Sequence, residues 1–255
     1  MKHVLVSGGA RGIGFACAKQ FALNGYNVSI IGKTQSNLDS AVESLQEIGD
    51  NITVNGYCGD VSDPMFVNSL IEKIDVTPID VLVNTAGAAK KAITTELTHA
   101  DWNHSMQSKF FTYTNVMDAV LPRMAARKSG SVVNVIGMGG KCQVVNHLNG
   151  GAANAALMLA TTGLAQAYAK FGIRVNGINP ASVETDHIKK FITQDAEWKG
   201  IPYEEAKAEL VSKFPMGRMV LPEEVAAMVF FVAGDSAPSI NGAIIPIEGA
   251  RNPMI

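Results

Sequence analysis

The chain has 255 residues, of which 47% are hydrophobic and 17% charged, so it can bury a large core as one α/β domain. A net charge of -2 at pH 7 excludes a general attraction to nucleic acids or anionic membranes. The three cysteines are unclustered, which argues against a disulfide framework or a zinc site. Because a signal-type start and an apolar run of about 18 residues are both missing, we expect a soluble, cytoplasmic protein.

In chain order, short apolar runs alternate with longer stretches of helical spacing. The runs predict strands at 4–6, 28–31, 53–58, 81–83, 131–136, 174–178 and 243–247. The stretches predict helices near 13–24, 35–48, 64–74, 99–126 and 151–170. This alternation predicts an α/β fold: a doubly wound parallel sheet with helices on both faces, in a single domain over 1–255.

One segment, at about 185–220, fits the alternation poorly. Two Xaa-Pro pairs, Ile201-Pro202 and Phe214-Pro215, flank charged helical stretches there. We expect this segment to be a mobile cover over a cleft that contributes to the substrate site. A plain surface excursion is the alternative.

A glycine-rich loop follows the first expected strand: residues 7–14 read Ser-Gly-Gly-Ala-Arg-Gly-Ile-Gly. Three glycines between a strand and a helix let the backbone approach a pyrophosphate, and the N–H groups of the helix's first turn face the anion. The loop therefore predicts a phosphate cradle. A tight turn without a ligand would use similar residues.

The ends of the next strands also carry nucleotide-type signals, since ligands of such sheets lie beyond the carboxyl ends of the strands. Gly32 and Lys33 follow the second strand, where an acidic residue would bind the ribose 2′-hydroxyl. Glycine and lysine leave room and positive charge for a 2′-phosphate, with Arg11 able to assist, which favours NADP(H) over NAD(H). A solvated loop lysine is the alternative for Lys33. Asp60-Val61 and the segment 84–87 (Asn-Thr-Ala-Gly) follow the third and fourth strands, as nucleotide contacts or as turn residues.

Five motifs in order resemble the short-chain dehydrogenase/reductase family: the glycine loop, Asp60-Val61, the segment 84–87, Arg174-Val175-Asn176 with Asn179-Pro180, and Ile247-Glu248-Gly249. The resemblance spans nearly the whole chain and implies one Rossmann-like domain, a nicotinamide cofactor and a homo-oligomer, usually a tetramer and otherwise a dimer. It also implies a set of cofactor-binding residues, and one departure from the motifs is Ala181, where the family usually has glycine. The set is Ser7, Gly8, Arg11, Gly12, Ile13, Gly14, Lys33, Asp60, Val61, Asn84, Ala86, Gly87, Pro180 and Thr185.

The family's catalytic Asn, Ser, Tyr and Lys are all missing from the aligned positions. These positions hold Lys109, Gly137, Gly150 and Asn154. A Tyr-x-x-x-Lys pattern does occur at Tyr203 to Lys207, but it lies far beyond Pro180, so we interpret it as a coincidence. Because Gly137 and Gly150 have no side chain to supply a proton or an oxyanion donor, ordinary carbonyl reduction would be nearly abolished unless other groups replace them.

Replacements are available in the same segments. Lys109 and Asn154 look like an exchange of the family's Asn and Lys, so Lys109 could aim its ammonium at the nicotinamide ribose with Asn154 as its partner. A lysine extending to solvent is the alternative. His147 and Cys142, in the loop after the fifth strand, could face the same cavity, although a surface position is the alternative for the histidine.

Two classes of function remain open. In the first, the chain is an atypical oxidoreductase that acts on a small carbonyl or alcohol compound, or a redox-assisted lyase or isomerase. Its catalytic residues would be Lys109, His147 and Asn154, with no metal, and the acid would be Lys109, His147, Cys142 or the substrate itself. In the second, it is a catalytically silent nucleotide-binding sensor or the partner subunit of an active relative. Both classes retain NADP(H) binding.

Overall fold

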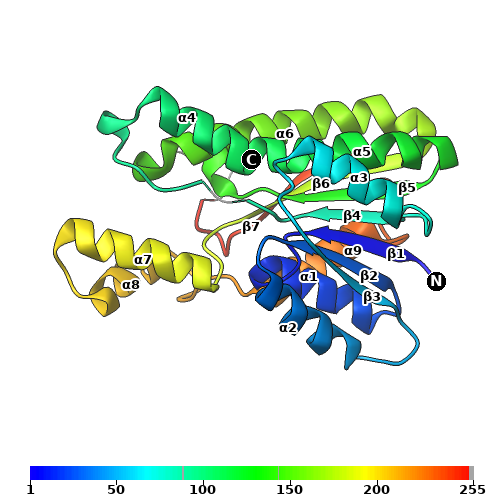
Figure 1. The fold of residues 1–255 in the computed structure, drawn as a ribbon. Coiled ribbons are helices and arrows are strands. Elements are labelled where there is room, and N and C mark those ends of the chain that lie inside the picture. The colour runs from blue at the N-terminus through cyan, green and yellow to red at the C-terminus, as the bar shows by residue number, and fades with distance from the viewer. Residues whose placement is uncertain (88, 143, 253–255) are drawn as a thin grey trace.

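Seven parallel strands form one sheet in the order β3-β2-β1-β4-β5-β6-β7 (Figure 1). The computed structural model describes residues 1–87, 89–142 and 144–252. The strands are β1 (His3–Ser7), β2 (Asn27–Gly32), β3 (Val54–Cys58), β4 (Val81–Asn84), β5 (Gly130–Val135), β6 (Ile173–Pro180) and β7 (Ile244–Ile247). The predicted doubly wound sheet is confirmed, and its direction of winding reverses between β1 and β4. In folds of this kind a ligand binds beyond that reversal.

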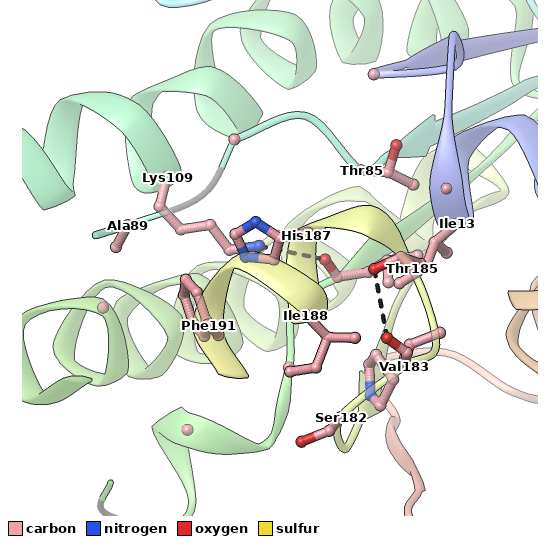
Figure 2. Close-up of a pocket in the computed structure, with 18 of the residues that line it drawn as sticks. Ile13, Thr85, Ala89, Lys109, Ser182, Val183, Thr185, His187, Ile188 and Phe191 are labelled. Atoms are coloured by element: carbon pink, nitrogen blue, oxygen red, sulfur yellow. Dashed lines mark hydrogen bonds between the residues drawn. The ribbon is translucent and has the colours of Figure 1, made fainter. Parts of the chain in front are cut away.

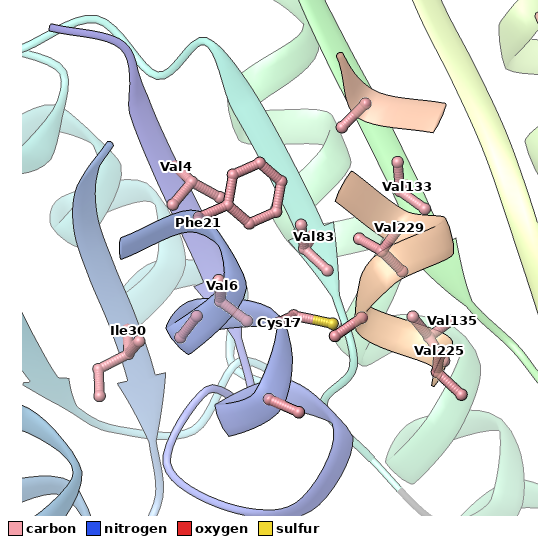
Figure 3. Close-up of a cluster of buried hydrophobic side chains, with 14 of the residues drawn as sticks. Val4, Val6, Cys17, Phe21, Ile30, Val83, Val133, Val135, Val225 and Val229 are labelled. Carbon is pink, nitrogen blue, oxygen red and sulfur yellow. The ribbon is translucent and has the colours of Figure 1, made fainter. Parts of the chain in front are cut away.

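Helices cover both faces of the sheet because alternate strand residues point to opposite sides. Val4 and Val6 pack on one face with α1 (Gly12–Leu23), α2 (Gln35–Gln46) and α9 (Pro222–Ala233). Leu5 packs on the other face with α3 (Pro64–Ile74), α5 (Thr112–Arg127) and α6 (Leu148–Tyr168). Figure 3 shows the first of these cores, where Phe21 and Cys17 lie between the strand valines and α9.

The cysteines of the chain are free thiols: Cys17 is buried, Cys58 exposed and Cys142 partly buried. Burial raises the pKa of the Cys17 thiol to about 12, so this side chain acts as a packing group. Over the described ranges, no helix combines the length and the apolar character needed to cross a membrane.

The predicted long helix at 99–126 is interrupted. It consists of α4 (His99–Ser105), a wider π-helical turn at Met106–Phe111 and then α5. Gly87 lies against this turn so closely that a Cβ on it would be 2.1 Å from the carbonyl oxygen of Ser108. Wide turns of this type change the direction of the side chains they carry, and this one carries Lys109.

Helix α9 was not predicted from the sequence, although it has ordinary start signals. Pro222 occupies its first turn together with Glu223 and Glu224, and the Glu224 carboxylate accepts the N–H of Leu221 at 2.7 Å. The helix fills the face of the sheet next to α1.

The segment at 185–220 forms α7 (Asp186–Lys199) and α8 (Tyr203–Val211), which project beyond the carboxyl edge of the sheet (Figure 1). The two helices share a small cluster of buried side chains, Ile192, Ala196 and Ala206. A bridge between Val183 and Val220 closes the base of the excursion.

Candidate active site at the carboxyl edge of the sheet

A cavity of about 760 Å³ lies at the carboxyl ends of the strands. The loops after β1, β2, β4, β5 and β6 form its floor and walls, and α7 covers it with His187, Ile188 and Phe191 (Figure 2). In the part of the chain that the structure describes, no group of three or more His, Cys, Asp or Glu side chains is placed to hold a metal ion.

The glycine-rich loop is shaped by contacts that leave no space for side chains. Gly8 has a φ of +82°, and a Cβ on Gly14 would lie 2.1 Å from the carbonyl oxygen of Gly8. The loop therefore closes tightly on the start of α1, whose first-turn N–H groups have no earlier turn to bond to. This end of the cavity can hold a pyrophosphate.

At the end of β2, the Nζ of Lys33 donates to the Asp60 carboxylate at 2.8 Å, with both side chains about half exposed. Gly32 and Arg11 line the cavity beside them. Among the described residues that line the cavity, the acidic side chains are Asp186 and Asp195, both on α7. The nucleotide end of the cavity is thus rich in cationic groups.

Lys109 is a buried lysine, with 8% of its surface exposed. Its Nζ donates to the Tyr113 hydroxyl at 3.0 Å and to the Val135 carbonyl at 3.5 Å, and it lies 4.7 Å from the centre of the Tyr113 ring. Burial lowers the pKa of Lys109 to about 7. The expected alternative of a lysine extending to solvent is wrong, because the π-helical turn directs the side chain inward towards His187 (Figure 2).

His147 lies beside Gly150 at the start of α6. A Cβ on Gly150 would be 2.3 Å from both Cε1 and Nε2 of the imidazole, so the ring fills the space next to the glycine. Burial, followed by the positive charges of Lys91, His187 and Lys109, lowers the pKa of His147 to about 4. The alternative of a surface histidine is wrong, and the imidazole is neutral at pH 7.

Asn154 is 7% exposed and lines the cavity, and its Oδ1 accepts no hydrogen bond from the described residues. Its amide Nδ2 lies 3.4 Å from the point where a Cβ on Gly137 would be. The expected pairing of Asn154 with Lys109 is not formed, since Lys109 donates to Tyr113 and Val135 instead. Cys142 also lines the cavity.

A family model for short chain dehydrogenases matches residues 2–196. The chain belongs to the short-chain dehydrogenase family. Members of this family are oxidoreductases that bind NAD(H) or NADP(H), which agrees with the glycine loop and the position of the cavity.

Similar proteins cover almost the full length of the chain. The 3-oxoacyl-[acyl-carrier-protein] reductase FabG of Thermotoga maritima is 31% identical over 97% of this chain and 96% of its own. The acetoacetyl-CoA reductase of Shinella zoogloeoides is 32% identical over 97% of each chain. A crystal structure of a variant of actinorhodin polyketide ketoreductase with NADPH superposes with a TM-score of 0.94, at 28% identity over 98% of this chain and 97% of the other.

Most of the cofactor residues implied by the family resemblance lie together in the cavity wall. They are Gly8, Arg11, Gly12, Ile13, Gly14, Lys33, Val61, Ala86, Gly87, Pro180 and Thr185. The hydroxyl of Thr185 donates to the Val183 carbonyl at 3.3 Å, at the start of α7 (Figure 2). Lys109, Gly137, Gly150 and Asn154, which the sequence places at the positions expected for the family's tetrad, line the same cavity, as does His147.

Three implied residues do not line the cavity. Asn84 is fully buried and donates to Asn134 at 2.9 Å, within the core between β4 and β5. Ser7 is fully buried as well, and Asp60 points outward to Lys33 and Ser62. The side chains of Asn84 and Ser7 therefore serve the sheet rather than the cavity surface. Tyr203 and Lys207 also lie outside the cavity wall, as expected of a coincidental pattern.

Several cavity residues were not predicted. Lys91, His187, Phe191 and Arg251 come from a loop, from the cover helix and from the segment after β7. None of the five motifs includes these residues. The sequence indicated only that the segment 185–220, which contains His187 and Phe191, would cover a cleft. Lys91 ties this cover to the body of the domain: its Nζ donates to Asp195 at 2.6 Å and lies 4.9 Å from the centre of the Phe191 ring.

Proposed function

We propose that the chain is an NADP(H)-dependent reductase of small carbonyl compounds, in which Lys109 replaces the family's tyrosine as proton donor. The observation that carries this proposal is the buried Lys109 amine in the cavity wall, whose pKa of about 7 suits proton transfer near neutral pH. The two glycines at the Ser and Tyr positions cannot perform this role.

Preference for NADP(H) is supported by the end of β2. Gly32 leaves space where an acidic side chain would bind a ribose hydroxyl, and Lys33 and Arg11 supply positive charge for a 2′-phosphate. The ion pair between Lys33 and Asp60 is half exposed and therefore weak, so Lys33 can turn to the phosphate at small cost. The crystal structure of the similar actinorhodin polyketide ketoreductase variant was determined with NADPH.

The chain's own groups can perform a reduction as follows. When bound, the reduced nicotinamide supplies a hydride to the carbonyl carbon of the substrate. The ammonium of Lys109 donates its proton to the carbonyl oxygen, and the Tyr113 hydroxyl and Val135 carbonyl hold the amine in place. Neutral His147 and the amide of Asn154 supply hydrogen-bond donors beside the oxygen. Lys109 then regains a proton from water.

The segment at 185–220 serves in this proposal as the substrate cover. Its support is that α7 presents Ile188 and Phe191 to the cavity, while Lys91 and Asp195 join the helix to the opposite wall. Closing such a cover would exclude water from the reacting carbonyl.

One observation favours the second class of function, a silent nucleotide-binding protein. Both hydrogen bonds that Lys109 donates go to the protein itself, to Tyr113 and Val135. A lysine held in this way also acts as a structural group of the core, and nucleotide binding does not require it.

The test compares NADPH oxidation by the native chain and by Lys109→Met over a panel of ketones and aldehydes, with Lys90→Met as control. Lys90 is exposed, in the same part of the chain as Lys91, and does not line the cavity. We expect Lys109→Met to lower kcat at least 100-fold while the Kd of NADPH is unchanged. Unchanged turnover in Lys109→Met contradicts the proposed donor, and NADPH binding without turnover of any compound supports the silent protein.

A further inference from the structure

Arg251 follows β7 and lines the cavity at the end opposite the nucleotide loops. Five strand spacings, about 24 Å, separate β2, which ends beside Lys33, from β7. Arg251 is therefore too far from the nucleotide end to bind a 2′-phosphate together with Arg11 and Lys33. It borders the part of the cavity formed by the loop after β5 and by the cover.

The guanidinium of Arg251 is held in one orientation by neutral groups. Its Nη1 donates to the Ser182 hydroxyl at 3.0 Å, and its Cζ lies 4.8 Å from the centre of the Phe214 ring. Ser182 belongs to the segment between Pro180 and Thr185, two of the implied cofactor-binding residues, so its hydroxyl holds Arg251 beside the expected cofactor site. Because the guanidinium is stacked and fixed, its remaining N–H groups can donate hydrogen bonds to a planar acceptor.

Arg251 forms no ion pair with any of the described residues. Glu248 is near enough to favour the charged form, but its carboxylate accepts the N–H of Asn252 at 3.1 Å. The two acidic residues of the cavity wall are both engaged elsewhere: Asp186 with Lys189 at 2.9 Å and Asp195 with Lys91 at 2.6 Å.

We infer that Arg251 is the anion-binding subsite for a carboxylate on the substrate, so that the natural substrate is an oxo acid. This rests on the proposed reductase function, which it refines by naming a substrate class. A carboxylate accepts two parallel hydrogen bonds from a guanidinium, which suits the orientation fixed by Phe214 and Ser182. Partial burial, which lowers the pKa of Arg251, strengthens the attraction because less water competes for the anion.

The experiment uses three oxo acids of increasing length, 4-oxopentanoate, 5-oxohexanoate and 6-oxoheptanoate, each beside its uncharged methyl ester. Binding to the chain loaded with NADP⁺ is measured by titration calorimetry, and turnover is measured by NADPH oxidation. In the native chain at least one acid should bind about 10- to 100-fold more tightly than its ester, because hydrogen bonds to charged groups contribute about 1.5–3 kcal/mol. Arg251→Met should remove this preference, and Arg251→Lys should restore part of it.

Lys170→Met is the matched control, since it removes another cation that lies over an aromatic ring, 5.1 Å from the centre of Phe171, but outside the cavity. It should keep the preference for acids. Equal binding of acids and esters by the native chain, or a preference that survives Arg251→Met or disappears in Lys170→Met, would overturn the inference. Equal reduction of the acids and their esters would support the proposed reductase function and contradict the carboxylate subsite at Arg251. Arg251-dependent binding of an acid without turnover of any probe sustains the subsite and rejects the reductase.

Discussion

The imidazole of His147 and the backbone of Gly150 are so close that a Cβ on the glycine would lie 2.3 Å from Nε2 of the ring. His147 is the N-cap residue of α6 and Gly150 lies in its first turn, where the family resemblance expects a tyrosine at position 150. The neutral imidazole of His147 therefore fills the space beside position 150. The ring can lie there only because residue 150 has no side chain.

Gly150→Ala should lower the free energy of unfolding by about 1–3 kcal/mol, because the new methyl group overlaps the ring of His147 and approaches Cβ of Ala89 at 2.9 Å. In a His147→Ala background most of this loss should disappear. The control is Gly163→Ala in the same helix, where no atom lies within 4 Å of the new Cβ and a gain of about 0.5–1 kcal/mol is expected. Urea unfolding of all the variants measures the coupling. Additive effects of the changes at 147 and 150, within about 0.5 kcal/mol, would show that the two positions do not compete for space.

The rate of carbonyl reduction should fall as the pH rises above about 7. Lys109 donates as an ammonium, and burial places its pKa at about 7, so the protonated fraction drops tenfold for each further pH unit. A pH profile of kcat with saturating NADPH measures this. A flat profile between pH 6 and about 9 would assign the proton to a group other than Lys109.

The same pKa shift predicts a pH dependence of stability. Lys109 loses its proton near pH 7 in the folded chain and near 10.5 in the unfolded chain, so the unfolded chain binds more protons between these values. Raising the pH through this window therefore stabilises the native chain, by an amount on the order of 3–5 kcal/mol from this group. Lys109→Met should be the more stable chain at pH 7, and its advantage should shrink towards pH 10. Parallel stability curves for the two chains would contradict the buried, low-pKa lysine.

The strands and most helices could be predicted because their signals are local. Val4 to Val6 alternate between the two cores, and Gly8 and Gly14 mark a turn that only glycine permits. The π-helical turn at 106–111 has no comparable local signal, and its Ser108 packs closely against Gly87 from another part of the chain.

The candidate site likewise has a part that could be predicted from local signals and a part that could not. The nucleotide end of the cavity could be predicted, because short motifs form it and glycines fix their backbone geometry. Asn84 lies within such a motif, yet its side chain bonds to Asn134 inside the sheet, a pairing set by the register of β4 and β5. Arg251 and Phe191 reach the cavity only through the packing of β7 and α7, which no local pattern specifies.

Gly32→Asp should weaken NADPH binding at least tenfold and leave NADH binding equal or tighter. The new carboxylate would repel a 2′-phosphate and accept a bond from a 2′-hydroxyl instead. Its Cβ would lie 3.1 Å from Cβ of Ala10, so a small adjustment of the glycine loop is required. Gly32→Ala is the control that makes the same adjustment without the charge, and Kd values for both cofactors decide the result. Equal losses of affinity for the two cofactors, or no change in either, would show that Gly32 does not lie beside the ribose 2′ group of the bound cofactor.

The ion pair of Lys91 and Asp195 should set the affinity for substrate through the cover helix α7. Lys91 is 10% exposed, bonds to Asp195 at 2.6 Å and to the Phe191 carbonyl at 3.3 Å, and so joins the loop after β4 to α7. Lys91→Met should raise KM several-fold with a smaller effect on kcat, because the cover opens while Lys109 stays in place.

The pair of Lys189 and Asp186 on the same helix provides the comparison. At 62% and 76% exposure it is screened by water, so Lys189→Met should change neither KM nor kcat measurably. Hydrogen exchange of the α7 amides should rise in Lys91→Met alone, since only that variant releases the helix from the opposite wall. If the two variants behave alike in both measurements, α7 is held by its cluster with α8 rather than by Lys91.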